Sequence, residues 1–211
     1  VSALGNTTDE LLGRARALTR EPAPEALAAL LAAGERAAVE YLALALQESG
    51  LPARSLAPER AGVRVTGSTL DSEPVAIDAA ALERALAVHP ILVLPGFVGL
   101  DEEGRLALLG RGGSDLTALA LAAALGAERC VLLKDVGGLY ERDPAAPGPQ
   151  PRRFAELTYA DALALDEGIV QRKAIRHAAR TATAFEVGRI GGSAPTRVGL
   201  GSTRTGRAEA P

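Results

Sequence analysis

The residues best suited to chemistry in this chain lie in a glycine-rich stretch at 108–115, between an apolar segment and a long Ala/Leu segment. Its three glycines allow a sharp turn and a close approach of the backbone to a ligand, and the N–H groups that begin a following helix carry partial positive charge. Arg111 adds a planar guanidinium that suits a carboxylate or a phosphate, and Ser114 and Asp115 stand where a helix cap or a substrate-orienting group belongs. The stretch predicts an anion site. A capped glycine turn is the alternative that these residues alone leave open.

Length and composition exclude several classes of function. The 211 residues are enough for one sizeable core, and the net charge of −3 offers no basic excess to attract nucleic acid or an anionic membrane. Cys130 is the single cysteine, so neither a disulfide nor a cysteine-based metal site is expected within one chain. There is no signal peptide and no apolar segment of membrane-spanning length. We therefore expect a cytoplasmic protein that binds neither nucleic acid nor membranes.

Hydrophobic periodicity and turn residues predict the elements that position this stretch. Helices are expected up to residue 20 and at 25–33, 35–49, 79–88, 116–125, 159–165 and 171–182. Short strands are expected at 54–56, 62–66 and 75–77, and fully buried strands at 91–94 and 130–133. Residues 97–98 and 105–109 are expected to form a hairpin, and the last strand is expected at 184–187. One apolar stripe is predicted to face the core, formed by Ala38, Tyr41, Leu42, Ala45 and Leu46.

The alternation of strands and helices predicts an α/β fold, a three-layer αβα sandwich with a mainly parallel central sheet and ligands at the carboxyl ends of its strands. The opening residues resemble the end of a strand whose beginning is missing. Residues 200–211 are polar, and a disordered tail is expected there.

Several motifs occur together in an order that resembles the amino acid kinase family, and most closely the catalytic domain of aspartokinases. They are the segment 2–9 (SALGNTTD), Gly34-Glu35-Arg36 as a helix start, Pro95-Gly96-Phe97, the segment 109–115 (LGRGGSD) and the segment 134–144 (KDVGGLYERDP). The resemblance covers residues 1–199, which it implies form one amino acid kinase domain. Family members commonly continue into regulatory domains, which are not expected in this polypeptide, and commonly form homodimers.

The resemblance implies transfer of the γ-phosphoryl group of ATP to the side-chain carboxylate of L-aspartate, with Mg²⁺ arriving on the nucleotide. The product would be 4-phospho-L-aspartate, at the first step of lysine, threonine and methionine biosynthesis. Such a transfer depends on positioning and charge neutralisation more than on a nucleophilic side chain, because the substrate carboxylate is itself the nucleophile.

The same resemblance implies roles for individual residues. Arg111 would hold the aspartate carboxylate, and Glu35 would accept from its ammonium group. The substrate-binding set is Thr8, Glu35, Arg111 and Ser114, the catalytic set is Gly112, Gly113 and Asp115, and the nucleotide-binding set is Lys134, Asp135, Tyr140, Arg172 and Lys173. The chain itself is expected to supply no metal site. On the residues alone, Glu35 is equally a first-turn acid favoured by the helix dipole, and Thr8 equally a cap.

Four departures from the family pattern bear on activity. Lys134 replaces a threonine, and Ala145 replaces an arginine. The segment 166–173 (DEGIVQRK) lacks the family's nucleotide-contacting lysine at its usual place, so Arg172 or Lys173 is expected to substitute. The family's opening Lys-Phe-Gly-Gly, which carries a catalytic lysine, has no counterpart here. The expectation is a fragment, a misassigned start or impaired catalysis.

Two alternatives stay open beside the aspartokinase hypothesis. One is a homologue that binds nucleotide or amino acid without turnover. The other is a kinase with a different acceptor, such as glutamate, N-acetylglutamate, carbamate or uridylate, from which the segment 111–115 (RGGSD) points away. A dinucleotide fingerprint is disfavoured because the frame from Gly110 reaches Asp115 where a third glycine is needed, and a Ser-His hydrolase lacks the G-x-S-x-G motif.

Overall fold

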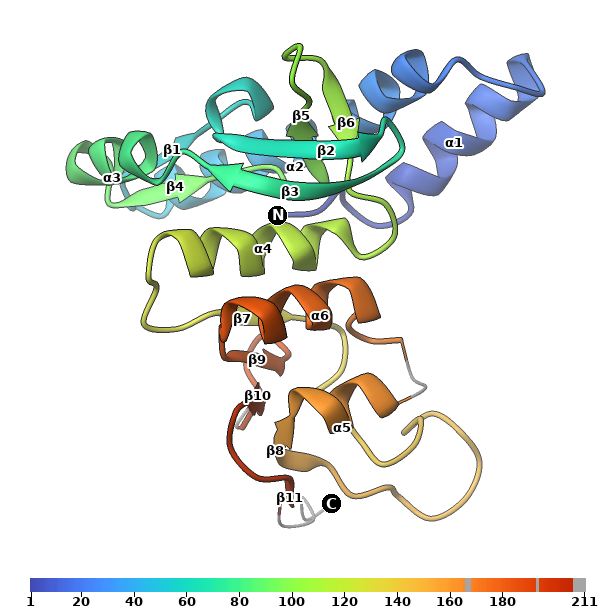
Figure 1. Cartoon of the computed structure of the whole chain (residues 1–211), viewed down its shortest axis with the longest axis vertical. Helices are drawn as coiled ribbons and strands as arrows, with labels where there is room; N and C mark the ends of the chain where they lie inside the picture. Colours follow the sequence, from blue (N-terminus) through green and yellow to red (C-terminus); the bar gives the residue numbers. More distant parts are fainter. Residues whose placement is uncertain (166–167, 193, 207–211) are drawn as a thin grey trace. The chain divides into compact units, whose positions relative to one another are not determined.

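A computed structural model describes residues 1–165, 168–192 and 194–206. They form a mixed α/β fold (Figure 1), which confirms the predicted class. The chain divides into two compact units, Val1–Thr117 and Ala118–Pro211. Among the described residues, no helix combines the length and the apolar character needed to cross a membrane.

The first unit contains two groups of hydrogen-bonded strands and the helices that pack on them. Its helices are α1 (Thr7–Leu18), α2 (Pro24–Glu48), the short 3₁₀ helix η1 (Pro58–Arg60), α3 (Ala79–Val88) and the start of α4 (Gly113–Ala124). Its strands are β1 (Ala53–Ser55), β2 (Val63–Ser68), β3 (Asp71–Ile77), β4 (Ile91–Val93), β5 (Val98–Leu100) and β6 (Leu106–Leu108). β1 pairs with β4 in parallel, and the larger sheet has the order β3-β2-β5-β6. α2 packs against α1, β1, β4 and β6.

α2 is one continuous helix where two were expected, so the predicted break at Gly34 is wrong. A Cβ atom at Gly34 would lie 3.1 Å from Thr7 Cγ2 and 3.3 Å from Ala3 Cβ. The glycine is therefore explained by the close approach of α1 and the segment before it to the middle of α2.

The predicted inward stripe on α2 is correct at Ala38, which is buried, and wrong at Tyr41 and Leu42, whose side chains are 62% and 39% exposed. Ala45 is also exposed. The buried face instead runs through Ala28, Leu31, Ala32, Glu35, Val39 and Ala43. Successive residues lie about 100° apart around a helix axis, so a predicted stripe that is displaced by one residue faces solvent instead of the core.

α3 has the bounds that the sequence predicts, because local signals fix both of its ends. The Asp78 carboxylate accepts a hydrogen bond from the Ala81 N–H at 2.9 Å, which caps the first turn. The helix stops at Val88, and His89, which precedes Pro90, has extended backbone angles.

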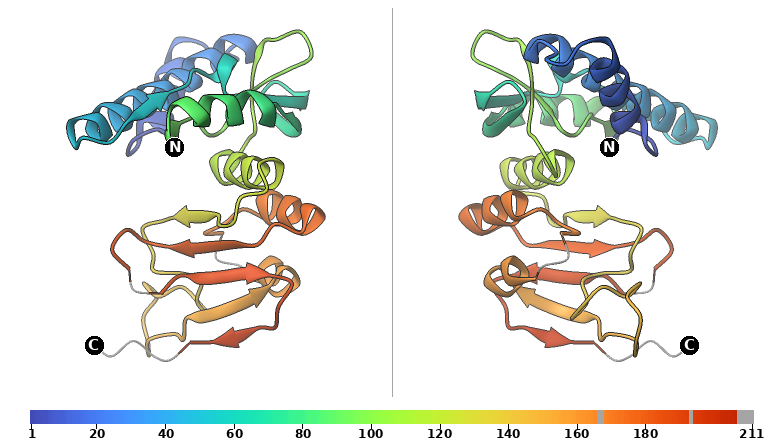
Figure 2. Two further views of the ribbon diagram at one scale, coloured as in Figure 1. Left: turned by 90° about the vertical axis from the view of Figure 1, so that its left-hand side faces the viewer. Right: turned by 90° about the vertical axis from the view of Figure 1, so that its right-hand side faces the viewer.

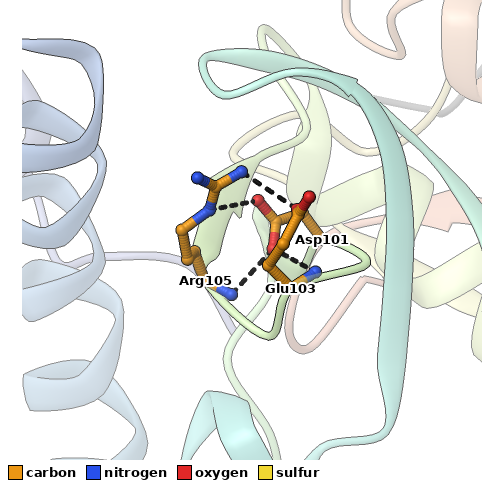
Figure 3. A network of polar contacts seen from close by, with 3 residues as sticks. All are labelled: Asp101, Glu103 and Arg105. Atoms are coloured by element: carbon orange, nitrogen blue, oxygen red, sulfur yellow. Dashed lines mark hydrogen bonds and ion pairs between the residues drawn. The ribbon is translucent and has the colours of Figure 1, made fainter.

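Two hairpins lie in the larger sheet of this unit. β5 and β6 pair antiparallel, as predicted, and Asp101 accepts hydrogen bonds from the backbone N–H groups of Glu103 and Arg105 in the turn between them. The Arg105 guanidinium donates to the side-chain carboxylates of Asp101 and Glu103 (Figure 3). In the other hairpin, β3 forms an edge of the sheet, and a register shift against β2 leaves Val75 as an extra residue beside Pro74.

The N-terminal residues pair with the segment that follows β4. The Val1 nitrogen donates to Leu94 O at 2.8 Å, and the Gly96 N–H donates to Val1 O at 2.7 Å. This pair of bonds is the hydrogen-bonding pattern of a parallel strand. The bonds of Val1 agree with the predicted strand end, although residues 1–3 form no regular strand.

The second unit is built on a five-stranded sheet of order β11-β8-β10-β9-β7, seen face-on in Figure 2. Its strands are β7 (Val131–Leu133), β8 (Phe154–Thr158), β9 (Phe185–Gly188), β10 (Thr196–Gly199) and β11 (Arg204–Thr205), and its helices are the rest of α4, α5 (Tyr159–Ala164) and α6 (Arg172–Thr181). α5 packs against α6, β8 and β10. Cys130, immediately before β7, is a buried cysteine whose Sγ lies 3.9 Å from Ala118 O.

Several strand predictions for the second unit need correction. β9 is not the last strand, since β10 and β11 follow it, and β8 was not predicted. β11 lies inside the segment expected to be a disordered tail, and the remainder of that tail, 207–211, lies outside the described residues. The strand before Lys134 is only partly buried, with Leu132 4% and Leu133 57% exposed; in β4 only Val93 is fully buried. Over both units, antiparallel strand pairs are as numerous as parallel ones among the described residues.

Candidate functional site

The glycine-rich stretch forms a tight connection from the end of β6 to the start of α4. Gly110 and Gly112 have φ angles of +72° and +74°, which L side chains rarely adopt. The Gly113 N–H donates to Gly110 O at 3.0 Å. Gly113 is confined for a different reason, because a Cβ atom there would lie 2.8 Å from the Phe97 ring and 3.0 Å from Leu109 Cβ. The predicted turn is confirmed: Gly110 and Gly112 are required by their positive φ angles, and Gly113 is required by close packing.

The segment Pro95-Gly96-Phe97 packs against the beginning of α4. A Cβ atom on Gly96 would lie 2.7 Å from Ser114 Cβ. Phe97 has a φ of +66°, a left-handed conformation that costs a non-glycine residue on the order of 1 kcal/mol or more. Its N–H donates to Thr117 Oγ1 at 3.1 Å, and its carbonyl accepts from the Leu109 N–H at 2.8 Å. Neither the left-handed conformation of Phe97 nor the contact with Thr117 is predicted from the sequence; the Pro-Gly pair before Phe97 is the available signal of an unusual turn.

The polar residues of the stretch differ in exposure. Arg111 is exposed, and its guanidinium has no hydrogen-bond or ion-pair partner in the described part of the chain. Ser114 is half-buried, and Asp115 is 9% exposed in the first turn of α4, where a negative charge is favoured by the helix dipole. An exposed guanidinium in a glycine turn at the start of a helix is able to bind an anion.

Glu35 is buried in the middle of α2, so its interpretation as a first-turn acid is wrong. Glu35 is only 3% exposed, and its Oε2 atom has no hydrogen-bond partner among the described residues. Burial raises the pKa of Glu35 to about 7, although a hydrogen bond from the Ala3 backbone and the charge of the Val1 ammonium group act to lower it. A buried carboxylate oxygen without a partner is costly, and a ligand that supplies a cation or a donor there would offset that cost.

Thr8 lies in the first turn of α1, next to Glu35's helix. It is half-buried, and its neighbour Thr7 is the residue that contacts Gly34. The hydroxyl that bonds to the backbone here is that of Thr7, which donates to Leu4 O at 2.6 Å, and the N-cap position is Asn6. The capping interpretation of Thr8 is therefore wrong.

Hydrogen bonds and close packing connect these residues to the glycine stretch within the first unit. Ala3 donates to Glu35, and the Val1 carbonyl accepts from Gly96, which in turn packs against Ser114. The predicted substrate-binding and catalytic residues thus belong to one compact unit.

A cavity of about 640 Å³ lies in the second unit, beyond the end of β7. Its walls are formed by Asp135, Val136, Glu141, Arg142, Asp143, Pro144, Leu165 and Ile169. Of the five predicted nucleotide-binding residues, only Asp135 lines it. The Lys134 N–H donates to Gly188 O at 2.7 Å, and the Tyr140 hydroxyl lies 3.2 Å from the position of a Cβ on Gly137. A cavity of this size with one apolar side can hold a nucleoside.

Arg172 and Lys173 form the first turn of α6. Arg172 is exposed and Lys173 is half-buried. Asp166 and Glu167, which precede them in the segment that departs from the family pattern, lie outside the described residues. Within the described ranges, no three His, Cys, Asp or Glu side chains gather closely enough to hold a metal ion.

A model of the amino acid kinase family matches residues 1–190. The chain belongs to the amino acid kinase family. This confirms the family that the order of motifs predicted.

Curated relatives within this family include aspartokinases from Geobacillus stearothermophilus, 36% identical over 190 residues, and from Thermus thermophilus, 34% identical over 190 residues. Each alignment covers 89% of this chain but 46% and 47% of the relative, respectively. The chain therefore spans about half the length of the curated relatives it matches.

Solved structures of family members agree with the fold. An aspartate kinase from Synechocystis aligns with a TM-score of 0.80 and 30% identity, over 96% of this chain and 34% of that one. Aspartokinase III from E. coli, in complex with aspartate and ADP, aligns with a TM-score of 0.70 and 25% identity, over 93% of this chain and 46% of that one. An isopentenyl phosphate kinase at 20% identity shares the fold, with a TM-score of 0.66.

Proposed function

We propose that this chain carries the catalytic activity of an aspartokinase, with residues 1–199 acting as one amino acid kinase domain. The reaction transfers the γ-phosphoryl group of ATP to the side-chain carboxylate of L-aspartate and gives 4-phospho-L-aspartate and ADP. The aspartokinases among its relatives support the reaction class. The observation that carries the proposal is the buried Glu35 carboxylate, whose Oε2 atom lacks a partner, in the same unit as the exposed Arg111 guanidinium.

An amino acid with a second carboxylate suits these two groups. Glu35 accepts hydrogen bonds from the ligand ammonium, and Arg111 binds the α-carboxylate through paired N–H groups. This leaves the side-chain carboxylate free to act as the nucleophile. Thr8 and Ser114 donate hydroxyl hydrogen bonds to the remaining carboxylate oxygens. In this proposal, the cost of burying Glu35 is offset when substrate binds.

The glycine stretch stabilises the charge that develops during transfer. The Gly112 N–H donates to the oxygens of the phosphoryl group in flight. The Gly113 N–H already donates to Gly110 O, so Gly113 contributes by holding this turn in a fixed geometry that requires little reorganisation. Asp115, held in the first turn of α4, orients the cationic side chains that act with them.

The cavity in the second unit takes the nucleoside part of ATP. Val136, Pro144, Leu165 and Ile169 supply apolar surface for the base, and Asp135 accepts from the ribose hydroxyls. The phosphates of ATP are bound by Arg172, at the start of α6, and by Lys134 or Lys173. Tyr140, whose hydroxyl lies close to Gly137, contributes to the nucleotide-binding site. Mg²⁺ carried on the nucleotide neutralises phosphate charge.

Hydroxylamine trapping tests the proposal, because an acyl phosphate reacts with hydroxylamine to give a coloured ferric hydroxamate. The folded chain is incubated with Mg·ATP and L-aspartate, L-glutamate, N-acetyl-L-glutamate, carbamate or UMP, and ADP is measured in parallel. Hydroxamate from L-aspartate alone supports the proposal. ADP release that depends on another acceptor assigns a different substrate. Calorimetric binding of L-aspartate without ADP or hydroxamate assigns a binding homologue and contradicts the kinase.

A further inference from the structure

The Thr117 hydroxyl joins two segments that lie 20 residues apart in the sequence. Thr117 is 2% exposed and stands in the second turn of α4. Its Oγ1 donates to Gly113 O at 2.9 Å and accepts from the Phe97 N–H at 3.1 Å. The bond to Gly113 O is the usual way in which a threonine hydroxyl within a helix finds a partner, on a carbonyl four residues earlier. The second bond pairs the backbone N–H of a residue in a strained conformation.

Phe97 is held in its left-handed conformation from three sides. Thr117 accepts from its N–H, the Leu109 N–H donates to its carbonyl, and its ring lies against Gly113. Such a conformation persists only where the surrounding structure fixes it. Removing the Thr117 hydroxyl would leave the Phe97 N–H without its acceptor and would free the residue to move toward an ordinary conformation.

Movement of Phe97 would be transmitted directly to the glycine stretch. The ring lies 2.8 Å from the position of a Cβ on Gly113, and Gly96, one residue earlier, is in equally close contact with Ser114. Leu109, at the other end of the stretch, is bonded to the Phe97 carbonyl. Phe97 therefore sets the position of both ends of the segment 109–114.

We propose that Thr117 is a positioning residue, which acts through Phe97 to hold the turn at Gly112 and Gly113, with its Gly112 N–H group, and Ser114 in the geometry that acceptor binding and phosphoryl transfer require. This inference rests on the proposed function. Thr117 touches neither substrate in this proposal, so its effect should be specific to the acceptor side and should leave ATP binding unchanged.

The experiment compares three variants of the full chain. Thr117→Val keeps the shape and removes the hydroxyl, Thr117→Ser keeps the hydroxyl, and Thr66→Val removes an exposed hydroxyl from β2 as a matched control. Thermal unfolding establishes that each variant folds. The KM values for L-aspartate and ATP and kcat are measured by hydroxamate formation, and amide hydrogen exchange is followed at Phe97.

We expect Thr117→Val to lower kcat/KM for L-aspartate about tenfold or more, since small misplacements of positioning groups cost up to about 100-fold in rate. Its KM for ATP should stay within about twofold of the wild-type value, and exchange of the Phe97 amide should accelerate. Thr117→Ser and Thr66→Val should resemble the wild type. A KM for ATP that rises as much as the KM for L-aspartate, or wild-type kinetics in a folded Thr117→Val variant, would overturn the inference.

Hydrogen exchange separates this inference from the proposed function. If the wild-type chain forms no hydroxamate, the kinase assignment fails, and the Phe97 amide and the calorimetric affinity for L-aspartate remain measurable. Faster Phe97 exchange together with about tenfold weaker L-aspartate binding in Thr117→Val supports positioning of the acceptor. Unchanged exchange, or faster exchange with no loss of ligand affinity, contradicts it.

Discussion

Replacing Glu35 with glutamine should make the chain more stable at alkaline pH while weakening the binding of L-aspartate. Glutamine has nearly the shape of glutamate but never carries a charge, so the substitution removes the burial of a carboxylate and leaves the packing of α2 in place. The unpartnered Oε2 atom of Glu35 is the reason to expect a gain and not a loss in the free energy of unfolding.

The magnitude follows from the change in the pKa of Glu35 between the unfolded and folded states. The ordinary value is 4.5 and the folded value is about 7, so the folded chain retains this proton to higher pH than the unfolded chain does. Each pKa unit corresponds to about 1.4 kcal/mol, and the full difference is about 3 kcal/mol. Below pH 4.5 Glu35 is protonated in both states and costs nothing. The penalty grows as the pH rises through 7 and is then constant.

The assay is urea unfolding of the wild type and Glu35→Gln between pH 4.5 and 8.5, followed by far-UV circular dichroism. Titrating groups that do not interact with Glu35 cancel in the difference between the two proteins. The difference in the free energy of unfolding should increase by about 3 kcal/mol in favour of Glu35→Gln over this range. A constant offset from the new amide does not affect this slope.

Parallel stability curves for the two proteins would refute the reasoning, because they would show that Glu35 does not titrate differently on folding. A difference that changes in the opposite direction would mean that the folded state stabilises the carboxylate. A ¹³C titration of the Glu35 carboxyl group gives the folded pKa directly and should centre near 7.

Other substitutions test the packing and the site. Gly13→Ala, where no atom lies within 4 Å of the new Cβ, should raise the free energy of unfolding by about 0.5–1 kcal/mol. Gly34→Ala should gain less or lose stability, because α1 is too close to the new Cβ. Equal urea midpoints for the two variants would contradict this. Asp78→Ala removes the cap at Ala81 and should lower the free energy of unfolding by about 1 kcal/mol in thermal or urea unfolding, with Asp78→Asn largely retaining it. Arg111→Ala should raise the KM for L-aspartate at least about tenfold with little change in stability or in the KM for ATP, and an unchanged aspartate KM would remove Arg111 from the site.

The parts of the fold that the sequence predicts well are those fixed by neighbouring residues. α3 begins at a capping aspartate and ends just before a proline, so local chemistry determines both bounds. Gly34 shows the opposite case. It looks like a helix boundary, yet the reason for it is the approach of another helix, which no local pattern records. β8, β10 and β11 are short and carry Arg, Glu and Thr, and only their places in the sheet make them strands.

The site divides in the same way. The turn at 110–113 is predicted because three glycines so close together favour a tight turn over a helix or a strand. The order of motifs identifies the family. Burial of Glu35 depends on how α2 packs, so its raised pKa is a property of the fold and not of the local sequence. The left-handed conformation of Phe97 is imposed by bonds from Thr117 and Leu109, both distant in sequence. Sequence patterns find residues that are unusual by type, but they miss ordinary residues in unusual conformations.

The position of β3 at the edge of its sheet bears on how the chain behaves at high concentration. An exposed strand edge is a template on which a second chain can add a strand, and the side chain of Val75 on this edge is 60% exposed. Pro74 removes one N–H donor from the edge, and the extra residue at Val75 bends the strand away from a flat register. Two copies that met along β3 would lack a complete hydrogen-bond ladder. The bulge and the proline therefore protect the molecule from aggregation through this edge.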